Sequence, residues 1–148
     1  MLPKHSVWYL AGLMALSAAC GGRHSAAGFR LPDDGDAGRG KTAFATLECH
    51  TCHQVPGVDL PRPTVQPPVP VLLGGDVDRE MTDGYLVTSI INPNHRLAAY
   101  PRSEISRGGR SRMPSYADRI TVRQLTDIVA FLQANYTVRP PAPQYYYH

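Results

Sequence analysis

Apolar side chains recur at helical spacing in three stretches of the chain, and the last of these is the clearest. Its apolar stripe consists of Leu125, Ile128, Val129 and Leu132. Thr121 as N-cap and Gln124 three residues later form a capping box, which predicts that this helix begins at Thr121. We expect it to end near Asn135 or Tyr136.

The first of the three stretches carries Ala37, Gly40, Phe44 and Leu47 on one face. Aspartates at 33, 34 and 36 supply the chemistry of a helix start, and the helix is predicted to run into Cys49. Glycine inside a helix costs about 1 kcal/mol relative to alanine. We therefore interpret Gly40 as a point of close backbone approach, and expect Gly40 and Phe44 to meet Ile128 and Phe131.

A middle helix is predicted from Thr82 and Asp83, which can cap it, to Ile91. Asn92-Pro93 ends it, because the residue before a proline avoids the helical region. Met81, ahead of this helix, is interpreted as a core residue.

Two long loops separate these helices. Six prolines lie between Val55 and Pro70, which excludes a helix or a central strand there, and the Gly74-Gly75 turn ends the loop. The second loop opens at His95, which we assign to the surface, and we expect it to be flexible. Its arginines are Arg96, Arg102, Arg107, Arg110 and Arg112.

The segment between the first helix and the proline-rich loop is C-x-x-C-H, formed by Cys49, Cys52 and His53. Two thiols at this spacing can each add to a vinyl group of haem, and the adjacent histidine can ligate the iron. A thioredoxin-like dithiol would need a preceding strand and a parallel-sheet pattern, and the sequence shows neither. A zinc site would need a second pair of ligands at suitable spacing, and the sequence has no such pair. The spacing therefore favours haem c, with His50 as an exposed spacer.

Two further residues are candidates for the haem site. Met113, followed by Pro114, lies 60 residues after His53, and its thioether is a soft ligand suited to haem iron. A ligating imidazole usually donates its second N–H to a carbonyl. Pro70, in the segment Pro70-Val71-Leu72, is the predicted carbonyl partner of His53.

The charge of the chain limits the classes of partner that we expect it to bind. The formal net charge is +3 and the basic residues form no dense run, so we expect no nucleic-acid partner. The arginines of the second loop, or Tyr100, can bind a haem propionate, form a solvated face or dock an acidic redox partner. The sequence leaves these three alternatives open.

Residues 1–19 have the pattern of a secretory signal peptide, with Lys4 before an apolar run and small residues at the end. The run Val7–Ala19 has 13 residues, short of the roughly 20 that span a bilayer. Cys20 follows at the position of a bacterial lipoprotein's modified cysteine, although ordinary cleavage would leave it as a stray thiol. Residues 20–35 then read as a flexible tether, and residues 137–148 as an extended tail.

Together these motifs resemble a class I c-type cytochrome over residues 36–136. The motifs are Gly40 and Phe44, the C-x-x-C-H segment, Pro70 and Leu72, Met113 and Pro114, and the stripe from Leu125 to Leu132. The resemblance implies an all-α domain of three to four helices with long Pro-rich and Arg-rich loops. It implies one covalently attached haem c, with His53 and Met113 as axial iron ligands.

The same resemblance implies an electron carrier and not an enzyme. The signal-like segment and the resemblance of Leu16–Cys20 to a lipoprotein cleavage site imply a location on the periplasmic side, with a membrane tether through lipid on Cys20. Its expected partner is a redox protein or a membrane respiratory complex. A small peroxidase-like haem enzyme and a structural haem subunit of a larger oxidoreductase remain as alternatives.

Overall fold

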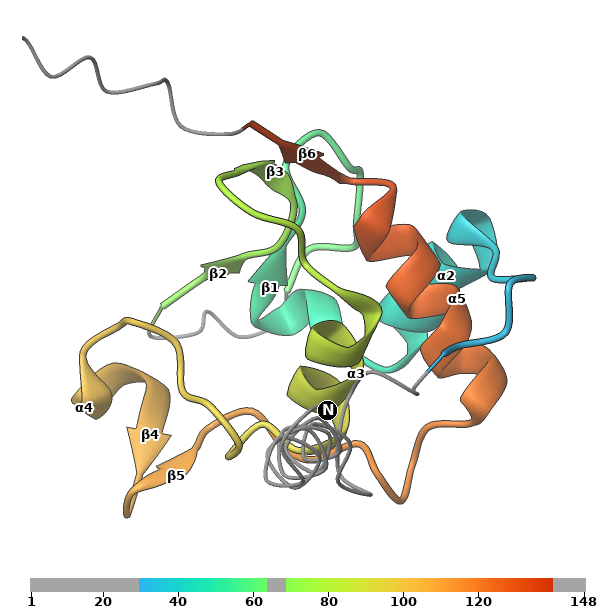
Figure 1. Cartoon of the computed structure of the whole chain (residues 1–148). Coiled ribbons are helices and arrows are strands. Elements are labelled where there is room, and N and C mark those ends of the chain that lie inside the picture. The colour runs from blue at the N-terminus through green and yellow to red at the C-terminus, as the bar shows by residue number, and fades with distance from the viewer. Residues whose placement is uncertain (1–29, 64–68, 140–148) are drawn as a thin grey trace, which may run out of the picture. The chain divides into compact units, whose positions relative to one another are not determined.

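Two helices, α2 (Ala37–Thr46) and α5 (Val122–Gln133), cross each other at the right of Figure 1. The computed structural model describes residues 30–63 and 69–139, so Cys20, the predicted signal peptide and the end of the predicted tail lie outside the described residues. At the crossing the helices are nearly in backbone contact. A Cβ added to Gly40 would lie 1.9 Å from the carbonyl oxygen of Asp127. This confirms that Gly40 marks a close approach.

The predicted helix starts are confirmed by their caps. The Asp36 carboxylate accepts a hydrogen bond from the Arg39 amide at 2.6 Å, and the capping box of Thr121 and Gln124 is complete. In the middle helix α3 (Asp83–Ile91), the Thr82 hydroxyl accepts from the Tyr85 amide at 3.2 Å. These bonds satisfy amides that the helix itself leaves without partners.

The ends of the helices are less well predicted than the starts. Helix α2 stops at Thr46 and does not reach Cys49, because Glu48 takes a left-handed conformation with φ of 60°. A separate 3-10 turn, η3 (Cys49–Thr51), then begins the C-x-x-C-H segment. Helix α5 ends at Gln133, two residues before the expected Asn135.

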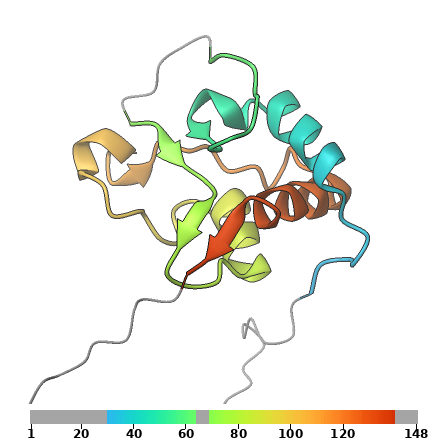
Figure 2. The same cartoon turned by 90° about the horizontal axis from the view of Figure 1, so that it is seen from above.

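Short strands make the fold less purely helical than the expected all-α class. Strand β1 (His53–Gln54) pairs in parallel with β2 (Val71–Leu72). Strand β3 (Gly75–Val77) pairs in parallel with β6 (Tyr136–Val138), as Figure 2 shows. The pairing of β6 with β3 attaches residues 137 and 138, the start of the expected tail, to the domain. In the described residues these strands close loops around a helical core, so the fold is that of a helical domain with strand-paired loops.

The arginine-rich segment contains regular structure, contrary to the expected flexible loop. It forms a short helix α4 (Arg102–Ile105) and a hairpin of β4 (Ser106–Arg107) and β5 (Arg110–Ser111), seen at the lower left of Figure 1. Gly108 and Gly109 form its two-residue turn, with φ of 57° and 76°. Two positive φ angles suit the turns that close tight hairpins, and glycine adopts them without strain.

The core lies where α2, α3 and α5 meet. Phe44 and Ile128 are its most completely buried large side chains, and the rings of Phe44 and Phe131 lie 5.5 Å apart in a tilted arrangement. Met81 packs against this core, as expected. One charged group is buried beside it. The carboxylate of Asp127 accepts hydrogen bonds from the Arg39 guanidinium at 2.9 Å and from the Asp36 amide at 2.9 Å.

Candidate haem site

The C-x-x-C-H segment is held between α2 and the first strand pair. Cys49 begins the η3 turn and is half-buried, Cys52 follows it and is exposed, and His53 opens β1. Backbone bonds fix both sides of the histidine, from the Val71 amide to the Cys52 carbonyl at 3.1 Å and from the Leu73 amide to the Gln54 carbonyl at 2.8 Å. The end of the proline-rich loop therefore positions His53.

The carbonyl partner of His53 is Val71, and the prediction of Pro70 was one residue out. Nδ1 of His53 lies 3.3 Å from the Val71 carbonyl oxygen, to which its N–H donates. The parallel register explains the difference, because it pairs His53 with Val71, whereas Pro70 lies before the strand and has no N–H for the ladder. This bond fixes the tautomer and leaves Nε2 with its lone pair.

The surroundings of His53 favour a neutral imidazole. Burial lowers the pKa of His53 below its ordinary value, and the hydrogen bond to the Val71 carbonyl only partly opposes this. The ring of Phe44 lies 6.5 Å from the imidazole and is tilted by 53°. A neutral, oriented imidazole is the form that ligates a metal.

Met113 lies in the segment that follows β5, and it lines the same pocket as His53. Its amide donates to the Ser111 hydroxyl of β5 at 3.1 Å, and the Ser115 hydroxyl donates to the Ile91 carbonyl at 2.6 Å. The Tyr116 amide donates to the Ile90 carbonyl at 3.3 Å. These contacts attach the Met113 segment to the hairpin and to the end of α3, where the helix carbonyls lack intrahelical partners.

Tyr116 is a site residue that the sequence analysis missed. Its hydroxyl donates to the Leu47 carbonyl at 2.9 Å, directly after α2, and burial raises its pKa, so the hydroxyl remains a donor. The signal was present, since an aromatic residue three positions after a candidate ligand is well placed to anchor the ligand loop. Nothing in the sequence identified Leu47 as its acceptor.

One apolar pocket joins these segments. Cys49, His53 and Met113 all contribute to its walls, whereas the exposed Cys52 is not among its lining residues. The rest of the lining is apolar apart from the hydroxyl of Tyr116, and it consists of Phe44, Leu47, Leu73, Ile90, Tyr116, Ile120, Ile128 and Leu132. This donor set fits haem c: one half-buried attachment thiol, one imidazole and one thioether surround an apolar space.

The alternatives to haem fit this geometry less well. Burial raises the pKa of the Cys49 thiol to about 11, whereas a redox-active dithiol depends on a lowered thiol pKa. Zinc would need a gathered ligand set. Within residues 30–63 and 69–139, no three His, Cys, Asp or Glu side chains are placed to hold a metal ion.

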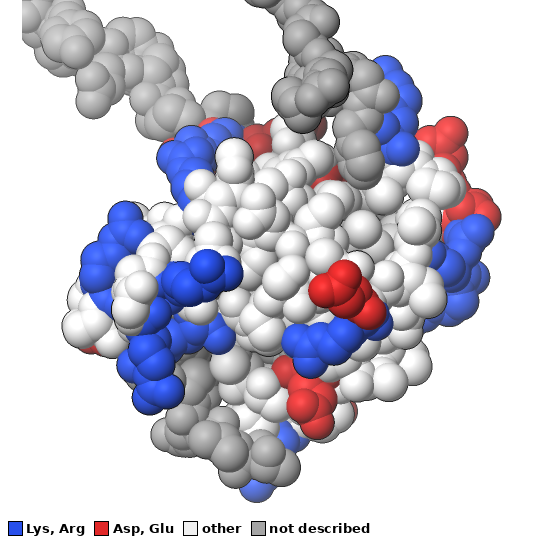
Figure 3. Space-filling model, turned by 90° about the horizontal axis from the view of Figure 1, so that it is seen from below, with Lys and Arg blue, Asp and Glu red and all other residues white. Residues whose placement is uncertain are grey.

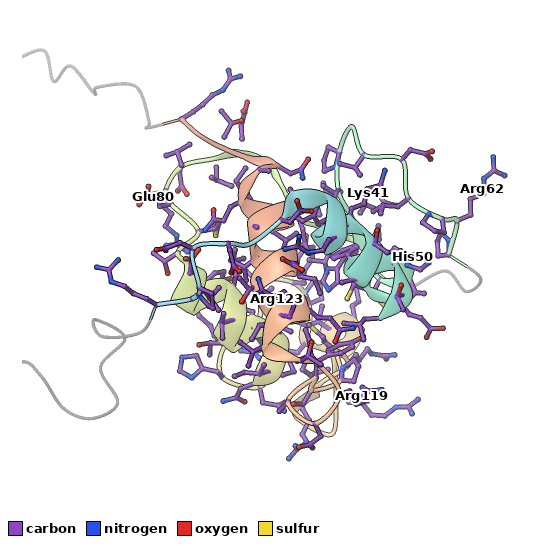
Figure 4. All side chains as sticks on the ribbon, turned by 90° about the vertical axis from the view of Figure 1, so that its right-hand side faces the viewer. Lys41, His50, Arg62, Glu80, Arg119 and Arg123 are labelled. Atoms are coloured by element: carbon purple, nitrogen blue, oxygen red, sulfur yellow. The ribbon has the colours of Figure 1, made fainter. Side chains whose placement is uncertain are left out.

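The other histidines are placed differently from His53. His50 was expected to be exposed, but it is half-buried, and its Nδ1 has no hydrogen-bond partner among the described atoms (Figure 4). It lies between the two cysteines, in the η3 turn. His95 is exposed and does not line the pocket.

The helical domain thus encloses an apolar pocket that residues of the C-x-x-C-H segment line together with Met113. The family model described as Cytochrome c matches residues 37–135, about two-thirds of the chain. The chain therefore belongs to the cytochrome c family, electron-transfer haem proteins whose domain binds covalently attached haem c. No curated protein and no solved structure is significantly similar to it. In the described part of the chain, no helix is long and apolar enough to cross a membrane.

Proposed function

We propose that this protein is an exported class I cytochrome with a single haem that carries one electron at a time. Cys49 and Cys52 attach the haem, and His53 and Met113 are its two axial iron ligands. The observation that supports this proposal best is the shared pocket, because His53 and Met113 line it together although they are 60 positions apart in the sequence. Only a folded site brings these two soft or borderline ligands into one apolar space.

The protein's part in this function is to fix both axial ligands. The bound haem c supplies one-electron exchange between its ferrous and ferric states. The Val71 carbonyl holds the imidazole of His53, while Ser111 and Tyr116 hold the segment that carries Met113. With both axial positions taken, no position remains for a substrate, which favours electron carriage over catalysis.

The residues that line the pocket affect the reduction potential of the haem. A thioether ligand raises the reduction potential, and an apolar, low-dielectric surrounding disfavours the added charge of the ferric state. Phe44, Ile128 and Leu132 supply such surroundings from α2 and α5. We expect a potential on the oxidising side of that of a bis-histidine haem in the same pocket.

The location and the partner complete the proposal. Residues 1–19 direct export, and lipid on Cys20 tethers the domain to a membrane on the periplasmic side through residues 20–35. A tethered carrier meets its partner by diffusion along a surface, which suits a membrane respiratory complex. Replacing Cys20 by Ala and following the protein between membrane and soluble fractions tests the tether.

Covalent haem on a gel tests the attachment. The full chain is produced in cells that attach haem c, denatured, and stained for haem after electrophoresis. We expect a stained band for the wild type and its loss in Cys49→Ala/Cys52→Ala. His50→Ala is the matched control in the same five-residue segment and should keep the band. Staining that survives loss of both cysteines, or that His50→Ala abolishes, contradicts the assignment.

A further inference from the structure

The hairpin of β4 and β5 is a fixed structure on the domain. The Ser111 amide donates to the side-chain oxygen of Asn94 at 2.8 Å, and the Arg112 amide donates to the Ile105 carbonyl at 2.9 Å. Ser106 pairs with Ser111 at this same end of the hairpin, and its hydroxyl donates to the Arg102 carbonyl at 2.6 Å. Side chains on this hairpin are therefore presented in a defined arrangement.

The hairpin tip places two like charges opposite each other. Arg107 pairs with Arg110 in the antiparallel register, on either side of the Gly108-Gly109 turn. Residues directly opposite in such a pair have Cβ atoms about 5 Å apart, and like charges there are destabilising. A local arrangement that costs stability is expected where a functional site needs it.

No carboxylate offsets this cost within the described residues. Ion pairs there involve Arg39, Arg123 and Arg139, and none involves Arg107 or Arg110, both of which are exposed. Figure 3 shows blue side chains gathered at the left of the molecule, the side on which Figure 1 shows the hairpin. The segment from Arg96 to Arg112 contains five arginines and one acid, Glu104.

The tip lies close to the candidate iron ligand. Met113 lies three positions after Arg110 in the sequence, so their Cα atoms are at most about 11 Å apart. This is about one Debye length at 0.1 M salt, so a partner held at the tip is within electrostatic reach of the haem pocket. The bond from the Met113 amide to Ser111 connects the pocket to the hairpin directly.

We propose that the hairpin tip, Arg107 with Arg110, is the docking site for a carboxylate-rich surface of a partner protein. Guanidinium groups bind carboxylates through paired hydrogen bonds, and two of them at one tip suit an acidic cluster. The proposal rests on the electron-carrier function above. Electrostatic docking of this kind raises the rate of encounter without requiring a large interface.

An acidic protein fits this tip better than an anionic membrane surface. Surface-seeking segments combine basic residues with apolar side chains that enter the headgroup region. The large hydrophobic side chains exposed in the described residues are Leu72, Tyr85, Tyr100, Val122 and Val138, and none belongs to the hairpin. The tip presents charge without an inserting apolar face.

The binding test uses polyglutamate as the probe and the full-length haem-loaded protein. Titration calorimetry at low and at moderate salt compares the wild type with Arg107→Gln/Arg110→Gln. The matched control is Lys41→Gln/Arg79→Gln, which removes the same charge from two exposed residues elsewhere (Lys41 is labelled in Figure 4). We expect the tip variant to bind about fivefold more weakly, and the control to bind like the wild type.

A second experiment tests whether the hairpin tip affects the rate of electron transfer. The reduced protein gives one electron to hexacyanoferrate(III), which becomes hexacyanoferrate(II), and the rate is followed by stopped flow. The rate should fall in the tip variant more than in the control, and polyglutamate should slow the wild type but not the tip variant. Vesicles of phosphatidylglycerol, added at the same total charge as polyglutamate, should slow the wild-type reaction less than polyglutamate does.

Four results would overturn the docking site. Equal weakening of polyglutamate binding in both variants means that net charge alone acts, and unchanged binding in the tip variant means that the tip is not used. Stronger competition by the vesicles assigns the tip to a membrane surface. A shifted reduction potential with unchanged polyglutamate binding assigns the arginines to the haem propionates. A protein without covalent haem contradicts the proposed function itself, a failure that the spectrum separates from all four.

Discussion

The hydroxyl of Tyr116 donates a hydrogen bond to the carbonyl of Leu47 across 69 residues of sequence, at 2.9 Å. It joins the segment that carries Met113 to the residue two positions before Cys49. The two sides of the pocket are thereby tied to each other at one point, independently of any bond to iron.

Replacing Tyr116 by Phe removes this bond and leaves the ring in place. We expect a loss of about 1 kcal/mol in the free energy of unfolding, as for a typical buried hydrogen bond. The looser methionine segment should also let added imidazole displace the thioether several-fold more readily, measured by spectral titration. Tyr100→Phe is the control, since Tyr100 is partly exposed and outside the pocket. Equal imidazole affinity in both variants would show that Tyr116 does not hold the loop.

Replacing Gly40 by Ala tests the helix crossing. The added Cβ would overlap the Asp127 carbonyl, so α2 and α5 must separate, and we expect a loss of about 2 kcal/mol or more on urea unfolding. Gly84→Ala is the matched control, because nothing lies within 4 Å of its Cβ position in α3. That variant should be neutral or slightly more stable, since alanine is the better helix former. Similar losses of stability in both variants would contradict the interpretation of Gly40 as a point of close backbone approach.

The buried carboxylate of Asp127 makes stability depend on pH. Hydrogen bonds from the Arg39 guanidinium hold the pKa of Asp127 below its ordinary value of 3.8. A group with a depressed folded pKa stabilises the fold above its unfolded pKa, and this contribution is lost as the pH falls through the folded pKa. Unfolding measured from neutral pH downward should therefore show a loss below about 3.8 that Asp127→Asn lacks. Asp59→Asn, at an exposed position, should retain it.

The helices and the attachment segment could be predicted because their signals are local. Thr121 with Gln124, and Thr82 ahead of α3, satisfy amides within three residues of themselves, so the sequence contains the whole interaction. The C-x-x-C-H spacing is likewise contained in five residues. Such features need no knowledge of the rest of the fold.

The features that the sequence did not yield depend on distant partners or on a single backbone angle. Val71 meets His53 only through a register set across 18 residues, and Tyr116 meets Leu47 only in the folded chain. The early end of α2 depends on the left-handed angle of Glu48, which is unusual for a residue other than glycine. The hairpin was predictable in principle, since Gly108-Gly109 is a recognised two-residue turn signal, but the arginines and serines around it suggested a flexible loop.

Replacing Met113 by Ala tests the central claim, that both axial positions of a covalently held haem are taken by this chain. The wild-type ferric protein should show the weak long-wavelength absorption of an iron–thioether bond. In Met113→Ala that absorption should vanish, covalent haem should remain, and cyanide should bind at least tenfold more tightly. Met81→Ala, a methionine packed against the core and outside the pocket lining, should keep the absorption. A wild-type protein without this absorption, or a Met113→Ala variant that retains it, would contradict the assignment of Met113 as an iron ligand.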